Sequence, residues 1–461
     1  MSKTIDDVVI AGIDANFEGW VEHQERRVLT PGVVPGDRVD LEIVASSQHH
    51  PRDFARAAQV HERGPGYEEP ICAHAGPVRG SCGGCPGMHL SSALRAQILA
   101  ERVTELLGER QVAWSWHDAP EHLGYRNRSN FVLTRQSGRI LLGSYAPRSQ
   151  DISPMAGCQV VRPIISRVQA ELEVRLSALG VPVGEEDEGL RWVSLRAASQ
   201  RRAGRPETGE QVVVELVVRD AEASWLDAAT EAIFAIEGVQ GVALTVNDRN
   251  TNAIRVDASR SLAGDCRLIE RYGEVELAID PGAFAQLNVE VASAMYRQVA
   301  QWVHGAQNIW DLYCGIGGLG LNSAVGRDNV HIFGAESVGA AIESARENAT
   351  RCGVNARYRV VDLGASDWRA SCPDEGALAR PEAILLNPPR KGLSKAVREV
   401  LSKPKSLGAK TLIYMSCDIG SFGRDTEELE QGGWRLAELQ AHDMLPQTSH
   451  VELLGRFELA R

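Results

Sequence analysis

The sequence predicts an α/β protein, and two patterns carry this prediction. From about residue 275 onwards, apolar runs that read as buried strands alternate with helical stretches, which is typical of a Rossmann-like parallel sheet. Before that point the chain reads as a small β module followed by an α+β region, with strands such as those at 131–133 and 212–218. A chain of 461 residues is long enough for about three domains. We predict these domains at residues 1–65, 66–270 and 271–461.

The N-terminal module is predicted from alternation. Apolar and polar residues alternate over residues 39–43, directly after the turn signal Pro35-Gly36. A small barrel that grips RNA and a generic β module both fit this pattern. Further along, a helical pattern covers residues 90–108 and ends at Gly108. That helix is a candidate to pack on the C-terminal domain.

The charge distribution argues against a generally basic nucleic-acid binder, because the net charge is −12. Arginines are nevertheless concentrated in two stretches, residues 121–148 and residues 191–205. Each stretch could be an ordinary solvated face, but together they predict a surface for a polyanion. The arginines concerned are Arg126, Arg128, Arg135, Arg139, Arg148, Arg191, Arg196, Arg201, Arg202 and Arg205.

Membrane and targeting signals are not found in the sequence. The chain has no apolar run of the roughly 18 residues that a transmembrane helix needs. The first residues, Met-Ser-Lys-Thr-Ile-Asp-Asp, do not read as a signal peptide. We therefore expect a cytoplasmic protein without membrane association. No feature indicates an obligate protein partner, so we expect a monomer.

Four of the nine cysteines form a pattern of metal ligands. Cys82 and Cys85 are a Cys-x-x-Cys pair, which lets two thiolates converge on one metal centre. Cys72 and Cys158 would complete a four-sulfur site. Zinc ribbons usually pair two such knuckles, and only one is present here, so the spacing favours iron–sulfur only modestly over zinc.

A glycine-rich turn predicts a nucleotide-type cofactor site. A strand at 309–312 runs into the turn Tyr313-Cys-Gly315-Ile-Gly317-Gly318, and a helix follows. Such a turn brings backbone N–H groups close to a ligand at the helix N-terminus. Glu336 ends the next strand, where a carboxylate can accept hydrogen bonds from ribose hydroxyls. Because Asp311 precedes the first glycine, the loop indicates S-adenosylmethionine rather than a nicotinamide dinucleotide.

Three further residues follow or begin strands of the same domain. Cys417 lies between an apolar strand and a helical pattern that stops at Gly432-Gly433, where a helix N-terminus can lower the pKa of a thiol. A structural cysteine fits this position equally well. Asn387 follows a strand and begins a rigid Asn-Pro-Pro turn. Strand residues flank Glu452, which is either an exposed carboxylate or a buried one with a raised pKa.

Taken together, these motifs resemble the RNA 5-methyluridine methyltransferase family, whose members methylate carbon 5 of uridine in ribosomal or transfer RNA. The resemblance covers nearly the whole chain. The N-terminal module resembles a TRAM RNA-binding domain, and the four cysteines resemble iron–sulfur ligands. The matching signatures are Tyr125-Arg-Asn-Arg128, Gly143-Ser-Tyr145, Phe284-Ala-Gln286-Leu-Asn288, Asn387-Pro-Pro-Arg-Lys-Gly392, Met415-Ser-Cys417-Asp418 and Thr448-Ser-His-Val-Glu452.

The resemblance implies a role for each matched residue. Cys417 would be the nucleophile and Glu452 the base. The substrate would be RNA, and we expect ribosomal RNA rather than transfer RNA. Cys72, Cys82, Cys85 and Cys158 would hold a [4Fe-4S] cluster. The residues that bind S-adenosylmethionine would be Gln286, Tyr313, Gly315, Gly317, Glu336 and Asn387. Asp418 departs from the family, in which Asn is common after the cysteine.

The chemistry of uracil agrees with these roles. Carbon 5 is a poor nucleophile, but a thiolate that adds at carbon 6 makes carbon 5 reactive towards a sulfonium methyl group. A base must then remove the carbon-5 proton. Two alternatives remain open. One is an amino-group methyltransferase of the Asn-Pro-Pro type, in which an aromatic residue would stand at Arg390. The other is a non-catalytic RNA-binding iron–sulfur protein.

Overall fold

The computed structural model describes residues 3–76, 80–184, 188–199, 209–248 and 259–460. Contacts divide the chain into two compact units. The first contains Met1–Glu105, Gly143–Cys158 and Leu445–Ser449, and the second contains Leu106–Leu142, Gln159–Met444 and His450–Arg461. The finer division into three domains stays a prediction. Arg201, Arg202 and Arg205, which we predicted to face a polyanion, lie outside the described residues.

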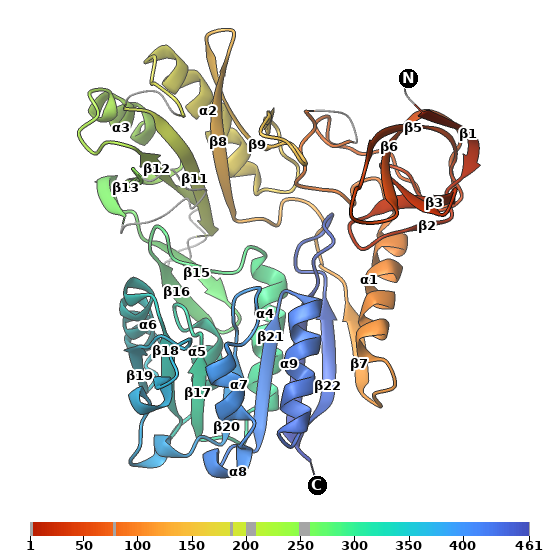
Figure 1. The fold of residues 1–461 in the computed structure, drawn as a ribbon. Helices are drawn as coiled ribbons and strands as arrows, with labels where there is room; N and C mark the ends of the chain where they lie inside the picture. Colours follow the sequence, from red (N-terminus) through yellow and green to blue (C-terminus); the bar gives the residue numbers. More distant parts are fainter. Residues whose placement is uncertain (1–2, 77–79, 185–187, 200–208, 249–258, 461) are drawn as a thin grey trace. The chain divides into compact units, whose positions relative to one another are not determined.

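A curled six-stranded sheet forms the N-terminal part of the first unit (Figure 1). Its strand order is β1-β5-β6-β4-β3-β2, and β4 and β6 pair in parallel while the other neighbours are antiparallel. The small β module is therefore confirmed as a sheet-rich domain, whereas its TRAM identity stays a prediction. The strands are β1 (Lys3–Val9), β2 (Gly12–Ile13), β3 (Glu18–His23), β4 (Arg26–Pro31), β5 (Arg38–Ser46) and β6 (Arg52–Glu62).

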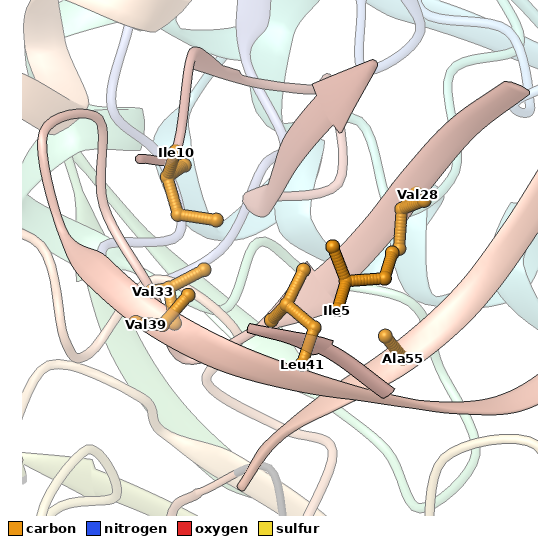
Figure 2. Close-up of a cluster of buried hydrophobic side chains, with 7 residues drawn as sticks. All are labelled: Ile5, Ile10, Val28, Val33, Val39, Leu41 and Ala55. Carbon is orange, nitrogen blue, oxygen red and sulfur yellow. The ribbon is translucent and has the colours of Figure 1, made fainter. Parts of the chain in front are cut away.

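Alternation explains how this sheet buries one face. Val39 and Leu41 of β5 point into a core of small aliphatic side chains, as the pattern at residues 39–43 predicts. Figure 2 shows this core, which is made by Ile5, Ile10, Val28, Val33, Val39, Leu41 and Ala55. Further along the chain, helix α1 covers Ser92–Leu107, close to the predicted range, and Gly108 follows it with a φ of +54°.

The second unit begins with an α+β region. Its sheet has the order β9-β8-β11-β12-β13-β14, and the predicted strands at 131–133 and 212–218 lie within β8 and β12. The strands are β8 (Arg128–Gln136), β9 (Arg139–Tyr145), β11 (Leu190–Ser199), β12 (Glu210–Val218), β13 (Val239–Val246) and β14 (Arg260–Gly264). Strand β10 (Ile152–Pro154) and the last residues of β9 belong to the first unit, where they pair with each other. The helices are α2 (Pro163–Ala178) and α3 (Leu226–Phe234), and a ribbon of β15 (Leu268–Tyr272) and β16 (Val275–Ile279) follows.

An eight-stranded sheet forms the C-terminal part of the second unit, in the order β19-β18-β17-β20-β21-β23-β22-β7. Strands β17 to β21 are parallel, and β23 runs antiparallel to both its neighbours. Apolar runs form the central strands because both faces of this sheet are covered. The strands are β17 (Asn308–Leu312), β18 (His331–Glu336), β19 (Ala356–Val360), β20 (Ala383–Leu386), β21 (Thr411–Ser416), β22 (Trp434–His442) and β23 (Glu452–Leu459).

Two groups of helices lie next to this sheet (Figure 1). The first group is α4 (Val289–Trp302), α5 (Gly318–Ala324) and α6 (Gly339–Cys352). The second is α7 (Lys395–Leu401), α8 (Pro404–Leu407) and α9 (Ile419–Gln431). Two short 3₁₀ turns, η1 (Trp368–Ser371) and η2 (Ala377–Ala379), come earlier in the chain, between β19 and β20. Among the residues that the structure describes, no helix has the length and apolar character required to cross a bilayer.

The edge strand β7 (Ala113–His117) was not expected in this sheet. It comes from a segment far earlier in the chain and pairs in parallel with β22, so that His117 lies opposite His442. Sequence reasoning missed it because the segment is short and its partner is more than 300 residues away. Arg110, just before β7, also forms an ion pair with Glu430 of α9 at 3.0 Å.

Candidate active site

The carboxyl ends of the parallel strands meet at one edge of the eight-stranded sheet. Tyr313 follows β17, Glu336 ends β18, Asn387 follows β20 and Cys417 follows β21. Because β23 runs in the opposite direction, its first residue, Glu452, lies at the same edge. The fold therefore brings together residues that the sequence spreads over 140 positions.

The glycine turn after β17 is held by a buried carboxylate. Asp311 Oδ2 accepts a hydrogen bond from the Gly320 backbone N–H at 3.0 Å, and burial raises the pKa of Asp311 to about 7. Gly317 precedes α5 with a φ of +87°, and a Cβ there would lie 2.7 Å from the Tyr358 hydroxyl. Only glycine fits this position, which leaves the backbone open to a ligand.

Glu336 is bound to the same turn. Its Oε2 accepts from the Gly315 N–H at 3.3 Å, and its Oε1 accepts from the N–H groups of Ser337 and Val338 at 2.7 and 3.1 Å. These contacts fix a half-buried carboxylate beside the glycine turn. Its predicted role in binding ribose hydroxyls stays a prediction.

Asp425 of α9 holds the segment that directly follows the Asn-Pro-Pro turn. This buried carboxylate accepts hydrogen bonds from the Leu393 N–H at 2.8 Å and the Tyr414 hydroxyl at 2.7 Å. Gly392 passes over it with a φ of +79°, and a Cβ there would lie 2.4 Å from Oδ2. Sequence reasoning did not single out Asp425, because an acid inside a helical pattern reads as a solvated residue.

Tyr313 and Asn387 both contact neighbouring backbone at this edge. The Tyr313 hydroxyl accepts a hydrogen bond from the Ser394 N–H at 3.2 Å, which ties the glycine turn to the end of the Asn-Pro-Pro turn. Asn387 is half-buried, and its N–H donates to the Leu312 carbonyl at 3.4 Å. Both side chains therefore lie where two neighbouring strands present their carboxyl ends.

Gln286 is buried next to a network that the sequence did not reveal. Its carbonyl accepts from the Tyr272 hydroxyl at 2.7 Å and from Asn127 Nδ2 at 3.1 Å. Asn127 also donates to the Tyr272 hydroxyl at 2.9 Å. Asn127 thus fixes the backbone of the residue predicted to bind the cofactor, a role that its Tyr-Arg-Asn-Arg motif could have suggested.

Cys417 lies between β21 and α9, as predicted. Asp418 caps the helix by accepting a hydrogen bond from the Ser421 N–H at 2.7 Å, a contact that Asn could also make. The expected lowering of the thiol pKa is wrong for this structure. Burial, and then the neighbouring Glu452, raise the pKa of Cys417 to about 11, while Arg390 acts in the opposite direction.

Glu452 is buried, with 5% of its surface exposed. Burial raises its pKa to about 8, and the Arg390 guanidinium opposes this shift. Within the described part of the chain, no group donates a hydrogen bond to its carboxyl. The alternative that Glu452 is an exposed carboxylate is therefore excluded. The site contains a buried carboxyl group whose raised pKa favours the protonated form.

Strand register places Cys417 beside Glu452. Ser416 and Leu453 are the last pair of the antiparallel ladder between β21 and β23. The next position on each strand is Cys417 on one side and Glu452 on the other. Residues that directly adjoin such a pair lie near each other, and Glu452 is close enough to raise the pKa of the Cys417 thiol. A thiol and a proton-accepting carboxylate therefore face the same space.

The four cysteines all belong to the first unit, but the metal centre is not supported. The Cys82 N–H donates to the His74 carbonyl at 2.8 Å, and His74 Nε2 lies 3.1 Å from the Ala156 carbonyl, so the loops that carry the cysteines approach one another. Among the residues described, no three His, Cys, Asp or Glu side chains are arranged to hold a metal ion. The cluster therefore stays a prediction.

The predicted arginine surface is only partly exposed. Arg191 and Arg196 are buried, and they donate to the carbonyls of Asn247 and Ala283 at 3.0 and 2.9 Å. These two residues therefore support the fold and do not face a polyanion. Arg126 and Arg128 are half-buried and close to each other, since Arg126 Nε donates to the Arg128 carbonyl at 3.0 Å.

Comparison with known proteins agrees with this arrangement. Residues 274–404, which contain the glycine turn and the Asn-Pro-Pro turn, match the methyltransferase small domain model. The chain is a methyltransferase. An uncharacterized RNA methyltransferase of Halalkalibacterium halodurans is 28% identical to the enzyme. The alignment covers 99% of the enzyme's chain and 96% of the relative's chain.

Two further proteins resemble the enzyme over nearly its full length. A 23S rRNA (uracil(1939)-C(5))-methyltransferase of Shewanella sediminis is 26% identical, over 98% of the enzyme and 95% of the relative. The crystal structure of Pyrococcus abyssi tRNA (uracil-54, C5)-methyltransferase, in complex with S-adenosyl-L-homocysteine, superposes with a TM-score of 0.75 at 23% identity. The superposition covers 98% of the enzyme and 100% of the Pyrococcus abyssi chain, so the two proteins share a fold.

Proposed function

We propose that the enzyme methylates carbon 5 of a uridine in RNA, with ribosomal RNA as the substrate. The adjacency of Cys417 and Glu452 at the cofactor edge of the sheet carries this proposal. An amino-group methyltransferase needs neither residue, whereas carbon-5 chemistry needs a nucleophile and a base. The name of the Shewanella relative supports ribosomal over transfer RNA.

The residues around the glycine turn fit S-adenosylmethionine, which supplies the methyl group when bound. Gly315 and Gly317 leave backbone open to the ligand, and Glu336, beside this turn, would accept hydrogen bonds from its ribose hydroxyls. Gln286, Tyr313 and Asn387 complete the binding set at the same edge. Cys417 adds to carbon 6 of uracil, and after methylation Glu452 takes the carbon-5 proton, so that the thiolate can leave.

Arg390 explains how the thiol can become reactive despite its raised pKa. Its guanidinium lowers the pKa of both Cys417 and Glu452. Deprotonation of the thiol is disfavoured mainly by burial and by the charge of Glu452. The Arg390 guanidinium is thus a group in this site that favours the thiolate.

We infer further that the curled N-terminal sheet is an RNA-binding module of the TRAM type and that the four cysteines hold a [4Fe-4S] cluster. Exposed Arg27 lies over Trp20 at 4.3 Å from the ring centroid, a pair that can stack on an RNA base. The placement of all four cysteines in one unit supports the cluster. No step of the reaction passes through it.

The test is tritium release from [5-³H]uridine RNA in the presence of S-adenosylmethionine. Only carbon-5 methylation releases the label, because the carbon-5 hydrogen must leave. Ribosomal and transfer RNA from a strain that lacks the enzyme serve as substrates. Methyl incorporation without tritium release would favour the amino-group reaction instead.

A further inference from the structure

A row of titratable side chains crosses the sheet from the candidate active site. Glu452 on β23 is the register partner of His442 on β22, and His442 is the partner of His117 on β7. Directly paired residues of neighbouring strands project from the same face of a sheet. The rings of His117 and His442 stack, with centroids 4.6 Å apart and planes inclined by 16°, as this requires.

His442 is buried and incompletely bonded. Only 3% of its surface is exposed, and its Nε2 has no hydrogen-bond partner among the described residues. A buried polar atom without a partner is costly, which indicates that a bound molecule completes this site. Burial, and then His117, lower the pKa of His442 to about 3, so the ring is neutral and offers one donor and one acceptor nitrogen.

The titratable groups next to His442 come from β23, from β7 and from the residue that follows β22. Glu452 approaches from β23 and His117 from β7, while Asp443 is its neighbour in sequence and donates its N–H to the His117 carbonyl at 3.0 Å. His117 is half-exposed, and its Nε2 lies 2.8 Å from Ser115 Oγ. The row thus leads from a buried carboxyl to a residue in contact with solvent.

Glu452 needs such a route if it acts as the base. It must lose the carbon-5 proton before each new turnover, but it is buried and its pKa favours retention of the proton. No described group is bonded to the carboxyl and able to take the proton. The unpartnered Nε2 of His442 is on the neighbouring strand, at the position directly opposite.

We propose that His442 holds, through Nε2, a water molecule that takes the proton from Glu452 and releases it to solvent. This inference rests on the proposed function. One proton moves from carbon 5 to the Glu452 carboxylate and then to the water, which restores the carboxylate; no electrons are exchanged. His442 acts through Glu452 and is a positioning residue. His117 keeps the His442 ring in place by stacking.

The experiment compares the first turnover with steady-state methylation in His442→Ala. Methyl transfer in the first turnover should match the unaltered enzyme, because Glu452 starts unprotonated at a pH above its pKa. The steady-state rate should fall by roughly tenfold or more. This loss is smaller than the roughly 10²–10⁴-fold loss of rate expected when a direct acid–base group is removed. Added imidazole should restore it, and His442→Gln, whose amide can also bind water, should retain most of the rate.

Gln440→Ala is the matched control, since Gln440 is also buried and lies two positions earlier on the same face of β22. It should show neither a selective steady-state loss nor a response to imidazole. Equal losses in both phases of His442→Ala without imidazole rescue, or unchanged turnover, would overturn the inference. Those results leave tritium release by the unaltered enzyme intact, whereas absence of that release would reject the proposed function itself.

Discussion

Cys417 and Glu452 occupy the position that directly follows the last pair of strands β21 and β23, in which Ser416 faces Leu453. The carboxyl group acts on the thiol electrostatically, because Glu452 raises the pKa of Cys417. One residue follows a parallel strand and the other begins an antiparallel one. The reversal of β23 is therefore what brings a nucleophile and a base to one edge of the sheet.

The first prediction separates the roles of these two residues. Cys417→Ala should bind RNA and S-adenosylmethionine but form no covalent bond with RNA. Glu452→Gln keeps the shape and removes the base, so the methylated ring cannot release Cys417. Loss of a positioned base costs roughly 10²–10⁴ in rate. A protein–RNA adduct that carries the methyl label should therefore accumulate in denaturing gels.

Normal turnover by Glu452→Gln would contradict these roles, and so would a labelled adduct in Cys417→Ala. Cys314→Ser is a useful comparison, because Cys314 is buried in the glycine turn and has no proposed chemistry. It should still form and release the adduct.

The second prediction concerns stability and pH. The folded-state pKa of Glu452 is about 8, above its ordinary value of 4.5, so the folded protein retains a proton that the unfolded chain releases. The stabilisation linked to this proton is complete below pH 4.5 and is lost as the pH rises to about 8. Relative to Glu452→Gln, the unaltered enzyme should lose up to about 1.4 kcal/mol of unfolding free energy per pH unit in that window.

Urea denaturation at pH 5, 7 and 9 would measure this difference. Glu427→Gln serves as the control, since Glu427 is exposed on α9. Its difference from the unaltered enzyme should be constant across the three pH values. A constant difference for Glu452→Gln as well would show that the carboxyl titrates normally.

The third prediction concerns the cysteines. If Cys72, Cys82, Cys85 and Cys158 hold a [4Fe-4S] cluster, anaerobically purified enzyme should be brown and contain stoichiometric iron and acid-labile sulfide. Cys82→Ser should lose the colour, whereas Cys352→Ser, on α6, should keep it. A colourless enzyme with stoichiometric zinc would favour the other metal that the spacing left open.

The fourth prediction tests the arginines near the start of β8. Replacing Arg126 and Arg128 together by Ala should weaken RNA binding and reduce its dependence on salt, because phosphate contacts are lost. Affinity for S-adenosylmethionine should not change. Arg435→Ala is the control, since Arg435 lies at the beginning of β22, at the edge opposite the candidate active site. An equal loss of cofactor affinity in the double variant would assign the two arginines a structural role.

The sequence by itself determined the local elements that carry the chemistry. Apolar runs, a glycine turn and an Asn-Pro-Pro turn are short-range signals, because each depends on backbone conformations that few residue types allow. They were sufficient to predict the strand that ends before Cys417, the helix that follows it and the turn that contains Gly317. The β character of residues 1–65 followed from alternation in the same way.

Only the tertiary structure decided how distant residues meet. Strand order and register place Glu452 beside Cys417 and His442, and they add β7, with His117, to a sheet otherwise formed by residues after 307. Burial also depends on packing, which is why the pKa of Cys417 is raised and why Arg191 and Arg196 are internal. Desolvation and cross-strand pairing are sums over the whole fold, and no local stretch of sequence contains them.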